Sequence, residues 1–177
     1  MSNSPSSRSS SAAPAGDGAL SARDLEYLRQ SIRVADQSRA EGRHPFGAIV
    51  VDASGAVVAS FGNNSLPPEG DPTQHAELRA VAAAARALGA EGMVGSTLFT
   101  SAEPCVMCAG AMYWTGIDRV VYALSEWQLL GLTGDHPENP TFSLPVREVF
   151  ARGQRSIEVS GPHLEDEAAL SHEGFWS

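Results

Sequence analysis

The sequence contains no lysine and only two cysteines among its 177 residues, and its formal net charge is −9. The twelve basic side chains are therefore all arginines, and the overall negative field repels a phosphate backbone. Residues 156–177 carry five acidic side chains and no arginine. These features disfavour a nucleic-acid partner.

Long apolar runs are also lacking. The sequence contains no stretch of 18 apolar residues that could span a membrane. Its N-terminal residues also lack the apolar core of a signal peptide. Two cysteines cannot build a disulfide framework, and their Cys-x-x-Cys spacing suits a metal site or a redox pair. We therefore expect a cytoplasmic protein with no membrane partner.

The first 18 residues differ in composition from the rest. They are almost wholly serine, alanine, glycine and proline, with too few large apolar groups to offset the entropy of ordering them. We expect residues 1–18 to form a disordered tail and residues 19–177 to form one domain. This length and a hydrophobic content of 42% suffice for a buried core.

Residues 19–177 alternate β-rich and helical patterns. Ser21 can cap a helix whose apolar side recurs every three or four residues and that ends near Gly42. Two β-rich runs joined at Ser54 and Gly55 predict an antiparallel hairpin. The predicted strands are residues 45–52, 56–62, 96–101, 119–124 and 156–161.

Helical segments connect or follow these strands. The helix predicted at residues 105–116 joins two strands, so we expect a right-handed crossover between parallel strands in a mixed sheet. An alanine-rich helix is predicted at residues 75–89. Residues 125–146 are expected to be loop, residues 147–153 are a weaker helical segment, and residues 165–176 are expected to form a terminal helix.

Four residues carry a chemical pattern. His75 and Glu77 lie at the start of one predicted helix, and Cys105 and Cys108 lie one turn apart at the start of another. Thiolates three residues apart share a helix face, and the positive end of the helix dipole lowers the cost of their charge. One imidazole and two thiolates give a tetrahedral Zn²⁺ three protein ligands, which leaves its fourth position for water. Glu77 is then placed to act as the base that moves protons beside the metal.

Each half of this pattern is weak alone. A single Cys-x-x-Cys is often redox-active or merely buried, and a structural zinc site is a further alternative. His-x-Glu followed by Pro-Cys-x-x-Cys is, however, the combination that zinc nucleobase deaminases share. The segments QHAELRA (74–80) and SAEPCVMCAGAMYW (101–114) match it at every required position.

These segments, with PFGA at residues 45–48 and GNN at residues 62–64, resemble the cytidine deaminase-like superfamily. The resemblance extends from about residue 25 to residue 124 and is closest to the guanine deaminase and tRNA adenosine deaminase branches. It implies an α/β fold, a three-layer α/β/α sandwich with a five-stranded mixed sheet. It also implies one catalytic Zn²⁺ per subunit, and the shared motifs do not choose between the two branches.

The resemblance also suggests residues that contact the substrate. Asn64, eleven positions before His75, would hold the edge of the base or its sugar, although asparagine is also common in left-handed turns. Backbone groups at Ala76 and near Ser101 would orient the base. Glu126 would be a second acid near the pocket mouth that relays protons, with a solvated loop carboxylate as the alternative.

Aromatic side chains supply the other candidates. Phe46 and Trp114 are plausible walls for a flat ring, and Tyr113 with Trp114 resembles the Tyr-Trp pair of guanine deaminases. Aromatic residues packed in the core fit the same sequence. The tail that ends in Phe175 and Trp176 resembles the guanine deaminase C-terminus. We expect the segment of residues 156–177 either to close over an active site, where it can be exchanged between the subunits of a homodimer, or to dock on its own core.

The sequence thus predicts a zinc-dependent aminohydrolase acting on a small aminated heterocycle, with guanine converted to xanthine and ammonia as the first candidate reaction. A tRNA wobble adenosine deaminase is an alternative that the acidic tail disfavours. Deamination of cytosine or another aminated ring is a further alternative. A zinc-stabilised scaffold without turnover is disfavoured by the presence of Glu77.

Overall fold

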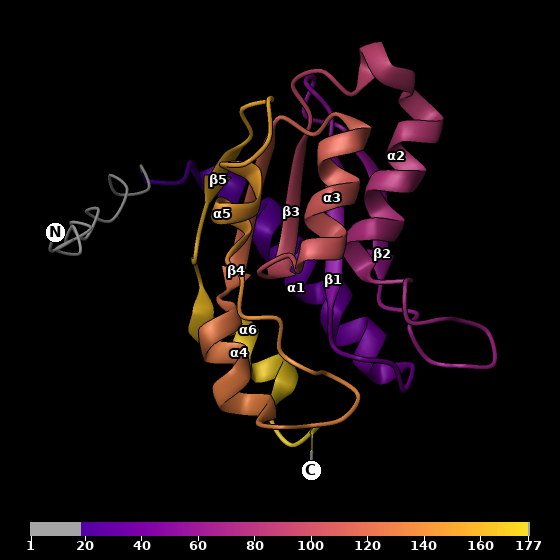
Figure 1. Cartoon of the computed structure of the whole chain (residues 1–177), viewed down its shortest axis with the longest axis vertical. Helices are drawn as coiled ribbons and strands as arrows, with labels where there is room; N and C mark the ends of the chain where they lie inside the picture. The colour runs from indigo at the N-terminus through magenta and orange to yellow at the C-terminus, as the bar shows by residue number, and fades with distance from the viewer. Residues whose placement is uncertain (1–18, 177) are drawn as a thin grey trace, which may run out of the picture.

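The computed structural model describes residues 19–176 and contains one five-stranded sheet flanked by helices (Figure 1). The predicted tail of residues 1–18 lies outside the described residues. The strands are β1 (Gly47–Val51), β2 (Val57–Gly62), β3 (Thr97–Ala102), β4 (Arg119–Leu124) and β5 (Glu158–Ser160). The helices are α1 (Ala22–Ala40), α2 (Ala76–Gly92), α3 (Val106–Thr115), α4 (Glu126–Thr133), α5 (Val146–Phe150) and α6 (Glu165–Ala169), followed by the 3-10 turn η1 (Leu170–His172).

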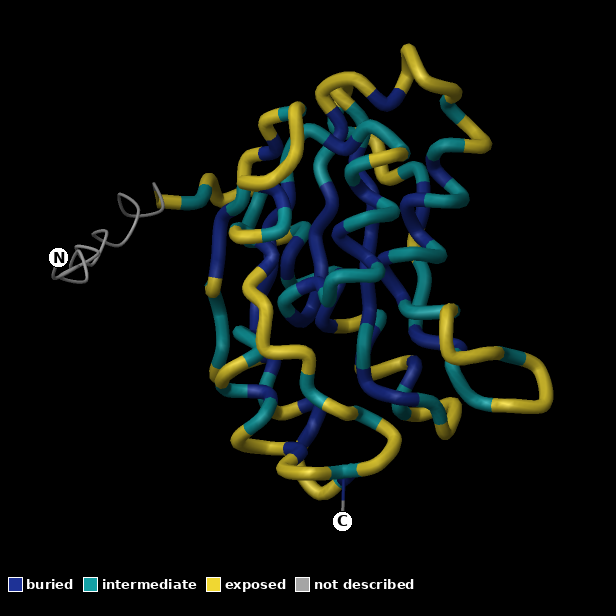
Figure 2. Tube along the Cα trace, in the orientation of Figure 1, coloured by how far each residue is buried: buried dark blue, intermediate teal, exposed yellow. Residues whose placement is uncertain are grey.

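The strand order is β2-β1-β3-β4-β5. Strand β1 pairs antiparallel with β2 and β3, whereas β3, β4 and β5 run parallel, with Leu98 opposite Val120. The hairpin and the parallel crossover predicted from the sequence are confirmed. Strand β1 lies inside the sheet and all five of its residues are buried, because helices cover both of its faces (Figure 2).

Two apolar clusters fill the spaces between the layers. One joins α2 and α3 to side chains such as Val50 and Leu98 on one face of the sheet. The other joins α1 to Ile49 and Phe99 on the opposite face. Because neighbouring strand residues point to opposite faces, these pairs alternate between the clusters. The chain therefore has the predicted three-layer α/β/α architecture.

Helix α1 is fixed at its start and along its length. The Ser21 hydroxyl accepts a hydrogen bond from the backbone N–H of Asp24 at 3.0 Å, and the Asp24 carboxylate accepts one from the Ser21 N–H at 3.3 Å. Farther along, α1 approaches β1 so closely that a Cβ atom on Gly47 would lie 2.4 Å from backbone atoms of Ser31 and Ala35. Glycine at this position therefore allows the helix to pack directly on the sheet.

Two predictions about the C-terminal third were wrong. Residues 125–146 were expected to be loop but include helix α4, whose start is fixed by Ser125 and by the Glu165 carboxylate that accepts from the Ser125 hydroxyl at 2.6 Å. This contact spans 40 residues and has no local sequence pattern. The expected terminal helix of residues 165–176 is only α6 and η1, and the chain then turns at Gly174, where φ is 66°.

None of the helices among residues 19–176 is both long and apolar enough to cross a membrane.

Candidate metal and active site

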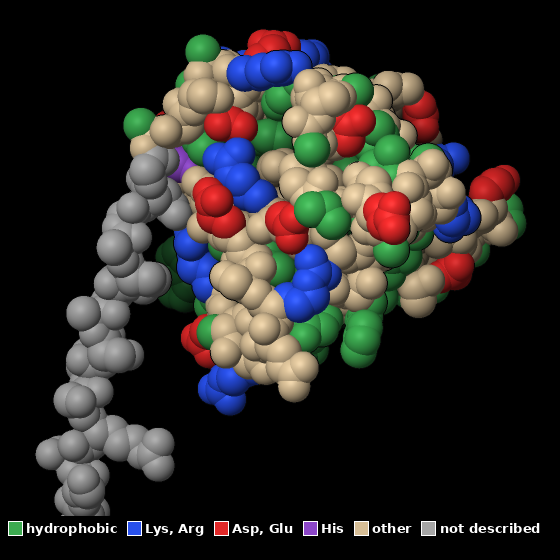
Figure 3. All heavy atoms as spheres, turned by 90° about the horizontal axis from the view of Figure 1, so that it is seen from above, with side chains coloured by type: hydrophobic (Ala, Val, Ile, Leu, Met, Phe, Trp, Pro, Cys, Tyr) green, Lys and Arg blue, Asp and Glu red, His purple; other side chains and the backbone are tan. Residues whose placement is uncertain are grey.

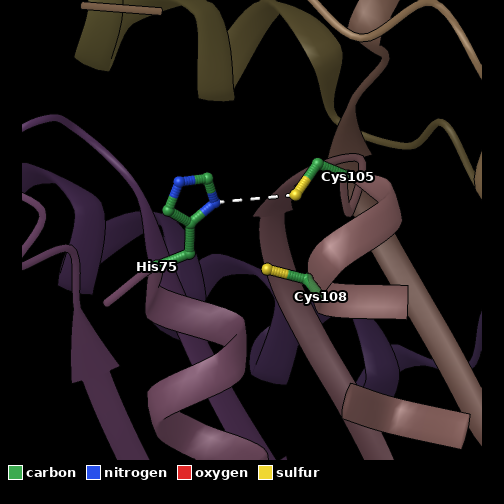
Figure 4. A group of neighbouring side chains, drawn as sticks. All are labelled: His75, Cys105 and Cys108. Atoms are coloured by element: carbon green, nitrogen blue, oxygen red, sulfur yellow. Dashed lines mark hydrogen bonds between the residues drawn. The ribbon is translucent and has the colours of Figure 1, made fainter. Parts of the chain in front are cut away.

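The three predicted metal ligands lie together because two helices begin at the same end of the sheet (Figure 4). His75 is the N-cap of α2, and Cys105 is the N-cap of α3. Neither side chain caps its own helix, so both are free to point toward each other. Cys108 follows one turn later on α3 and is fully buried. The positive ends of both helix dipoles thus meet at the three donor atoms.

The donor atoms fit a tetrahedral zinc ion. His75 Nδ1 and Cys105 Sγ are 3.7 Å apart, and the three donor atoms all lie within 4.8 Å of one another. Zinc bonds of about 2.1 Å to nitrogen and 2.3 Å to sulfur imply a separation of about 3.6 Å between two ligands at the tetrahedral angle. The residues present therefore fit Zn²⁺ in both chemistry and spacing.

The charge of the two thiols supports the same conclusion. The hydrogen bond with Cys108, together with the one to His75, lowers the pKa of the Cys105 thiol to about 4 despite its burial. The contact with Cys105, along with burial, raises the pKa of the Cys108 thiol well above its usual value. The pair by itself therefore holds one negative charge. A divalent cation is what stabilises both thiolates at once.

Glu77 lies two residues beyond His75 in the first turn of α2 and is only 6% exposed. Its Oε2 atom lies 3.7 Å from Cys108 Sγ, which donates to it. Burial is the largest cause that raises the pKa of this carboxyl, to about 7, and the Cys105 charge adds to the effect. A carboxyl with a pKa near neutrality can both accept and return a proton at neutral pH.

These residues border a cavity of about 760 Å³. Its lining includes His75, Glu77 and Cys105 together with side chains from α4 and from the segment of residues 134–144. Several carboxylates line it, and none of the lining residues in the described chain is an arginine. The cavity lining therefore offers no guanidinium or ammonium group to bind a phosphate.

Glu126, predicted as a second acid, does line the cavity. Burial and then the neighbouring Glu103 carboxylate raise the pKa of Glu126 to about 7. Glu103 also accepts hydrogen bonds from the backbone N–H of Glu126 at 3.2 Å and of Val146 at 3.0 Å. It thereby fastens the start of α4 and the start of α5 beside the metal ligands.

We expect Glu126→Gln to change how stability depends on pH. The pKa of Glu126 is about 7 in the folded chain against an ordinary value of 4.5, so the folded state retains this proton longer than the unfolded state. Wild-type stability should therefore fall as pH rises from 4.5 to about 7, and glutamine removes that loss. The melting temperature of the variant should rise relative to wild type across this interval. Thermal unfolding as a function of pH measures it, with Glu148→Gln on an exposed residue of α5 as the control, and a difference independent of pH contradicts the assignment.

The structure places Asn63, rather than the predicted Asn64, on the cavity wall. Asn64 donates instead to the Gln74 side chain at 2.5 Å and to the Glu69 carbonyl at 3.4 Å. Asn63 accepts from the backbone N–H and hydroxyl of Ser65 through Oδ1, both at 2.7 Å, which leaves its amide N–H groups to donate toward the cavity. The two asparagines are adjacent, so a count of residues from His75 does not separate them.

Of the other predicted substrate contacts, some line the cavity and others do not. Phe46 lines the cavity as expected. Ser101 does not, because its side chain faces away and accepts a hydrogen bond from the Gly47 N–H at 3.0 Å. The next residue, Ala102, lines the cavity instead. Ala76 is fully buried in the first turn of α2 and is outside the lining.

Tyr113, predicted as a substrate contact, and Trp114, predicted as a cavity wall, both lie outside the cavity lining. Both stand at the C-terminal end of α3, roughly 13 Å along the helix from Cys105 at a rise of 1.5 Å per residue. The Tyr113 hydroxyl accepts from the Gln154 N–H at 3.1 Å, and Trp114 is 84% exposed.

The C-terminal aromatic residues dock on their own chain. Trp176 is 9% exposed, and its indole N–H donates to His172 Nδ1 at 3.1 Å. Its ring lies 5.1 Å from that of His44 and 6.2 Å from that of Phe46, both of which line the cavity. Trp176 and its neighbour Phe175 therefore support the cavity wall from behind without lining it.

The sequence predictions missed Asn63, Glu103, His44 and Glu138 among the polar cavity residues. Glu103 precedes Pro-Cys-x-x-Cys in the SAEPC segment, so its place beside the motif was a usable signal. His44 and Glu138 are 94 residues apart and meet only in the folded chain.

Comparison with known proteins identifies relatives of this site. Residues 21–124 match a family model described as the cytidine and deoxycytidylate deaminase zinc-binding region. A probable cytosine deaminase of Schizosaccharomyces pombe is 45% identical over 157 residues, which are 89% of this chain and 94% of that protein. The guanine deaminase of Bacillus subtilis is 40% identical over 98 residues, which are 55% of this chain and 62% of that protein.

Solved structures give the same fold. The structure of a guanine deaminase from Nitrosomonas europaea is similar with a TM-score of 0.71 and 27% sequence identity, covering 91% of this chain and 88% of that one. The superfamily resemblance and the sandwich fold that the sequence predicted are therefore confirmed.

Proposed function

Because the chain belongs to the cytidine and deoxycytidylate deaminase family of zinc-dependent enzymes, we propose that it deaminates an uncharged nucleobase or nucleoside, with guanine and cytosine as the two candidate rings. The observation that carries this proposal is the buried Glu77 carboxyl beside His75, Cys105 and Cys108 at the wall of a cavity. A scaffold protein has no use for a buried carboxyl that is costly to ionise.

The residues of the chain supply most of the reaction. His75, Cys105 and Cys108 would hold the Zn²⁺, which when bound would make a water molecule acidic enough to attack the amino-bearing ring carbon. Glu77 accepts one proton from the attacking water and donates it to the ring nitrogen. It then accepts the second proton from the hydroxyl left on the ring carbon and passes it to the amino group, which departs as ammonia. The sum is hydrolysis: the base gains a carbonyl oxygen from water and releases ammonia, so guanine gives xanthine. Asn63 holds the base edge, and Phe46 packs against its plane.

The charge of the cavity supports an uncharged substrate. Its lining contains Glu77, Glu103, Glu126 and Glu138 and, within residues 19–176, no arginine. At the end of the molecule away from the cavity, seen from above in Figure 3, acidic and basic side chains are interspersed without a continuous basic patch. A tRNA or a nucleotide would place phosphate groups near these carboxylates without compensating cations.

The extent of the sequence match favours cytosine over guanine. The probable cytosine deaminase of Schizosaccharomyces pombe matches 89% of this chain, whereas the Bacillus subtilis guanine deaminase matches 55%. A match along nearly the whole chain includes the segment of residues 134–144, which borders the cavity but lies outside the shared zinc-binding motifs. Similarity in this segment to a probable cytosine deaminase supports cytosine as the substrate.

The test is ammonia release by the zinc-loaded protein from guanine, guanosine, cytosine, cytidine, the corresponding monophosphates and an anticodon stem-loop. We expect turnover of one of the uncharged ring systems and no measurable turnover of monophosphates or RNA. Turnover of the stem-loop alone would establish the tRNA alternative, and silence on the whole panel would exclude the proposed substrates. Because the two thiols must stay reduced to bind zinc, we place the enzyme in the cytoplasm.

We also propose that the enzyme is a homodimer. Trp114 on α3 and Trp127 on α4 are each 84% exposed, and large aromatic side chains are enriched in protein interfaces. We expect sedimentation to give a dimer at micromolar concentration and the double variant Trp114→Ser, Trp127→Ser to shift it toward monomer. Replacing Leu170, an exposed residue of η1, by serine is the control. A wild-type protein that is monomeric at all concentrations contradicts the proposal.

A further inference from the structure

The cavity has a second polar group besides the predicted metal and acid residues. His44 Nε2 and Glu138 Oε2 are 2.9 Å apart, and both residues line the cavity. His44 precedes β1, whereas Glu138 belongs to the segment of residues 134–144 that covers one side of the cavity. The pair joins this segment to the residues that lead into β1.

His44 is held on every side. It is 4% exposed, its Nδ1 lies 3.2 Å from the Ser65 hydroxyl, and the rings of Phe175 and Trp176 pack against it at 5.9 and 5.1 Å. An imidazole fixed in this way sets the direction of the carboxylate that it binds. His44 is therefore a positioning residue for Glu138.

Glu138 keeps a free acceptor atom. His44 Nε2 lies 2.9 Å from Oε2, and a carboxylate has a second oxygen, Oε1, that can accept a further hydrogen bond. The hydrogen bond to His44 is the largest cause that lowers the pKa of the Glu138 carboxyl, so it is ionised at neutral pH. Asp135, three residues earlier in the same segment, is exposed like Glu138 but does not line the cavity.

Resting on the proposed deaminase function, we propose that Glu138, oriented by His44, is a specificity-determining residue that accepts a hydrogen bond from the substrate at the ring nitrogen that carries the sugar in nucleosides. In a free base this nitrogen, N9 of guanine or N1 of cytosine, carries a hydrogen. In a nucleoside it carries a ribose with hydroxyl donors. Both forms present a neutral donor to the carboxylate, and a phosphate does not.

Geometry explains why this group would read that end of the substrate. The amino-bearing carbon must face His75, Glu77 and Cys105, which form one part of the lining. The nitrogen that carries the sugar is separated from that carbon by other ring atoms in both ring systems. It therefore points toward the remainder of the cavity, where the segment of residues 134–144 contributes Glu138 as its charged lining residue.

The test compares Glu138→Gln with Asp135→Asn, a matched change of carboxylate to amide in the same segment. Glutamine keeps a side-chain oxygen that can bind His44 but removes the charge. On the base or nucleoside that the wild type deaminates, we expect Glu138→Gln to raise KM roughly tenfold or more with kcat changed less, since a hydrogen bond to a charged group is lost. Asp135→Asn should match wild type.

Methylated substrates separate substrate contact from a structural role. 9-Methylguanine and 1-methylcytosine carry neither the N–H nor a ribose hydroxyl. The wild type should therefore show the same raised KM on them as Glu138→Gln shows on the parent substrate, and the KM values of variant and wild type on the methylated substrates should be equal. Comparison of base, 2′-deoxynucleoside and ribonucleoside then tells whether the donor is the ring N–H or a hydroxyl. An equal loss on parent and methylated substrates, or no loss on either, overturns the proposal.

The role of His44 is tested by measuring KM and kcat of His44 variants on the same substrates. His44→Leu should raise KM as Glu138→Gln does, the double variant should be no worse than Glu138→Gln alone, and His44→Gln, which keeps an N–H donor, should restore part of the affinity. Additive losses would show that His44 does not act through Glu138. If the wild-type protein releases no ammonia from any of the substrates tested, the deaminase proposal is wrong. If the wild type is active and Glu138→Gln has the same KM, only the proposed role of Glu138 is wrong.

Discussion

Replacement of Glu77 by glutamine should lower kcat by about 10²–10⁴ while leaving one zinc ion bound per chain, because general acid–base catalysis contributes on that order and glutamine cannot carry the proton. Glutamine has nearly the same shape, and Glu77 is not among the three residues whose donor atoms form the metal cluster. Metal analysis and steady-state kinetics on the same preparation measure both quantities.

The matched control is Glu91→Gln, which changes an exposed carboxylate at the far end of the same helix. It should leave kcat and zinc content as in wild type. Retention of full activity in Glu77→Gln would remove the proton carrier from the proposed mechanism and return the zinc-stabilised scaffold to consideration. Loss of zinc together with activity would mean that the carboxyl supports the metal site.

Cys108→Ser should lose both zinc and activity. The Cys108 thiol is fully buried and supplies one of three donor atoms, and a serine hydroxyl is a poor zinc ligand at neutral pH. Loss of metal activation, worth several kcal/mol of transition-state stabilisation, lowers kcat by about 10²–10³ or more. Metal binding also stabilises the folded state, so the melting temperature should fall.

The control for this variant is Ala109→Ser, which introduces a hydroxyl at the neighbouring, equally buried position of α3. It should lower stability but keep the zinc ion, which separates the cost of a buried hydroxyl from the loss of a ligand. Chelation of the wild type should reproduce the properties of Cys108→Ser, and readdition of Zn²⁺ should restore activity only in the wild type. Full zinc content in Cys108→Ser would exclude this residue as a ligand.

The fold and the reactive centre were predictable for related reasons. His75, Glu77, Cys105 and Cys108 occupy two short segments, each at the start of a helix, so local spacing defines their geometry. The hairpin and the parallel crossover likewise follow from neighbouring segments of the chain. Such features are written in the sequence as fixed distances between residue types.

The substrate side of the cavity was less predictable because side-chain direction decides it. Asn63 and Asn64 have the same chemistry, and only the fold shows that the second of them is turned toward Gln74. Residue type indicated an aromatic wall at Trp114 and a substrate contact at Tyr113, but helix α3 places both outside the cavity lining. The pairing of His44 with Glu138 depends on segments 94 residues apart, for which no local pattern exists.

The ligands His75 and Cys105 are the cap residues of their helices, and this has a consequence for how the family can diverge. The positions of both side chains are set from the helix start, so added or deleted turns at the opposite ends leave the donor atoms in register. Helix α2 already departs from helical geometry near its C-terminal end, where Gly89 has a φ of 67°. Insertions and deletions at the C-terminal ends of these helices can therefore be tolerated without moving the metal ligands at their N-terminal ends.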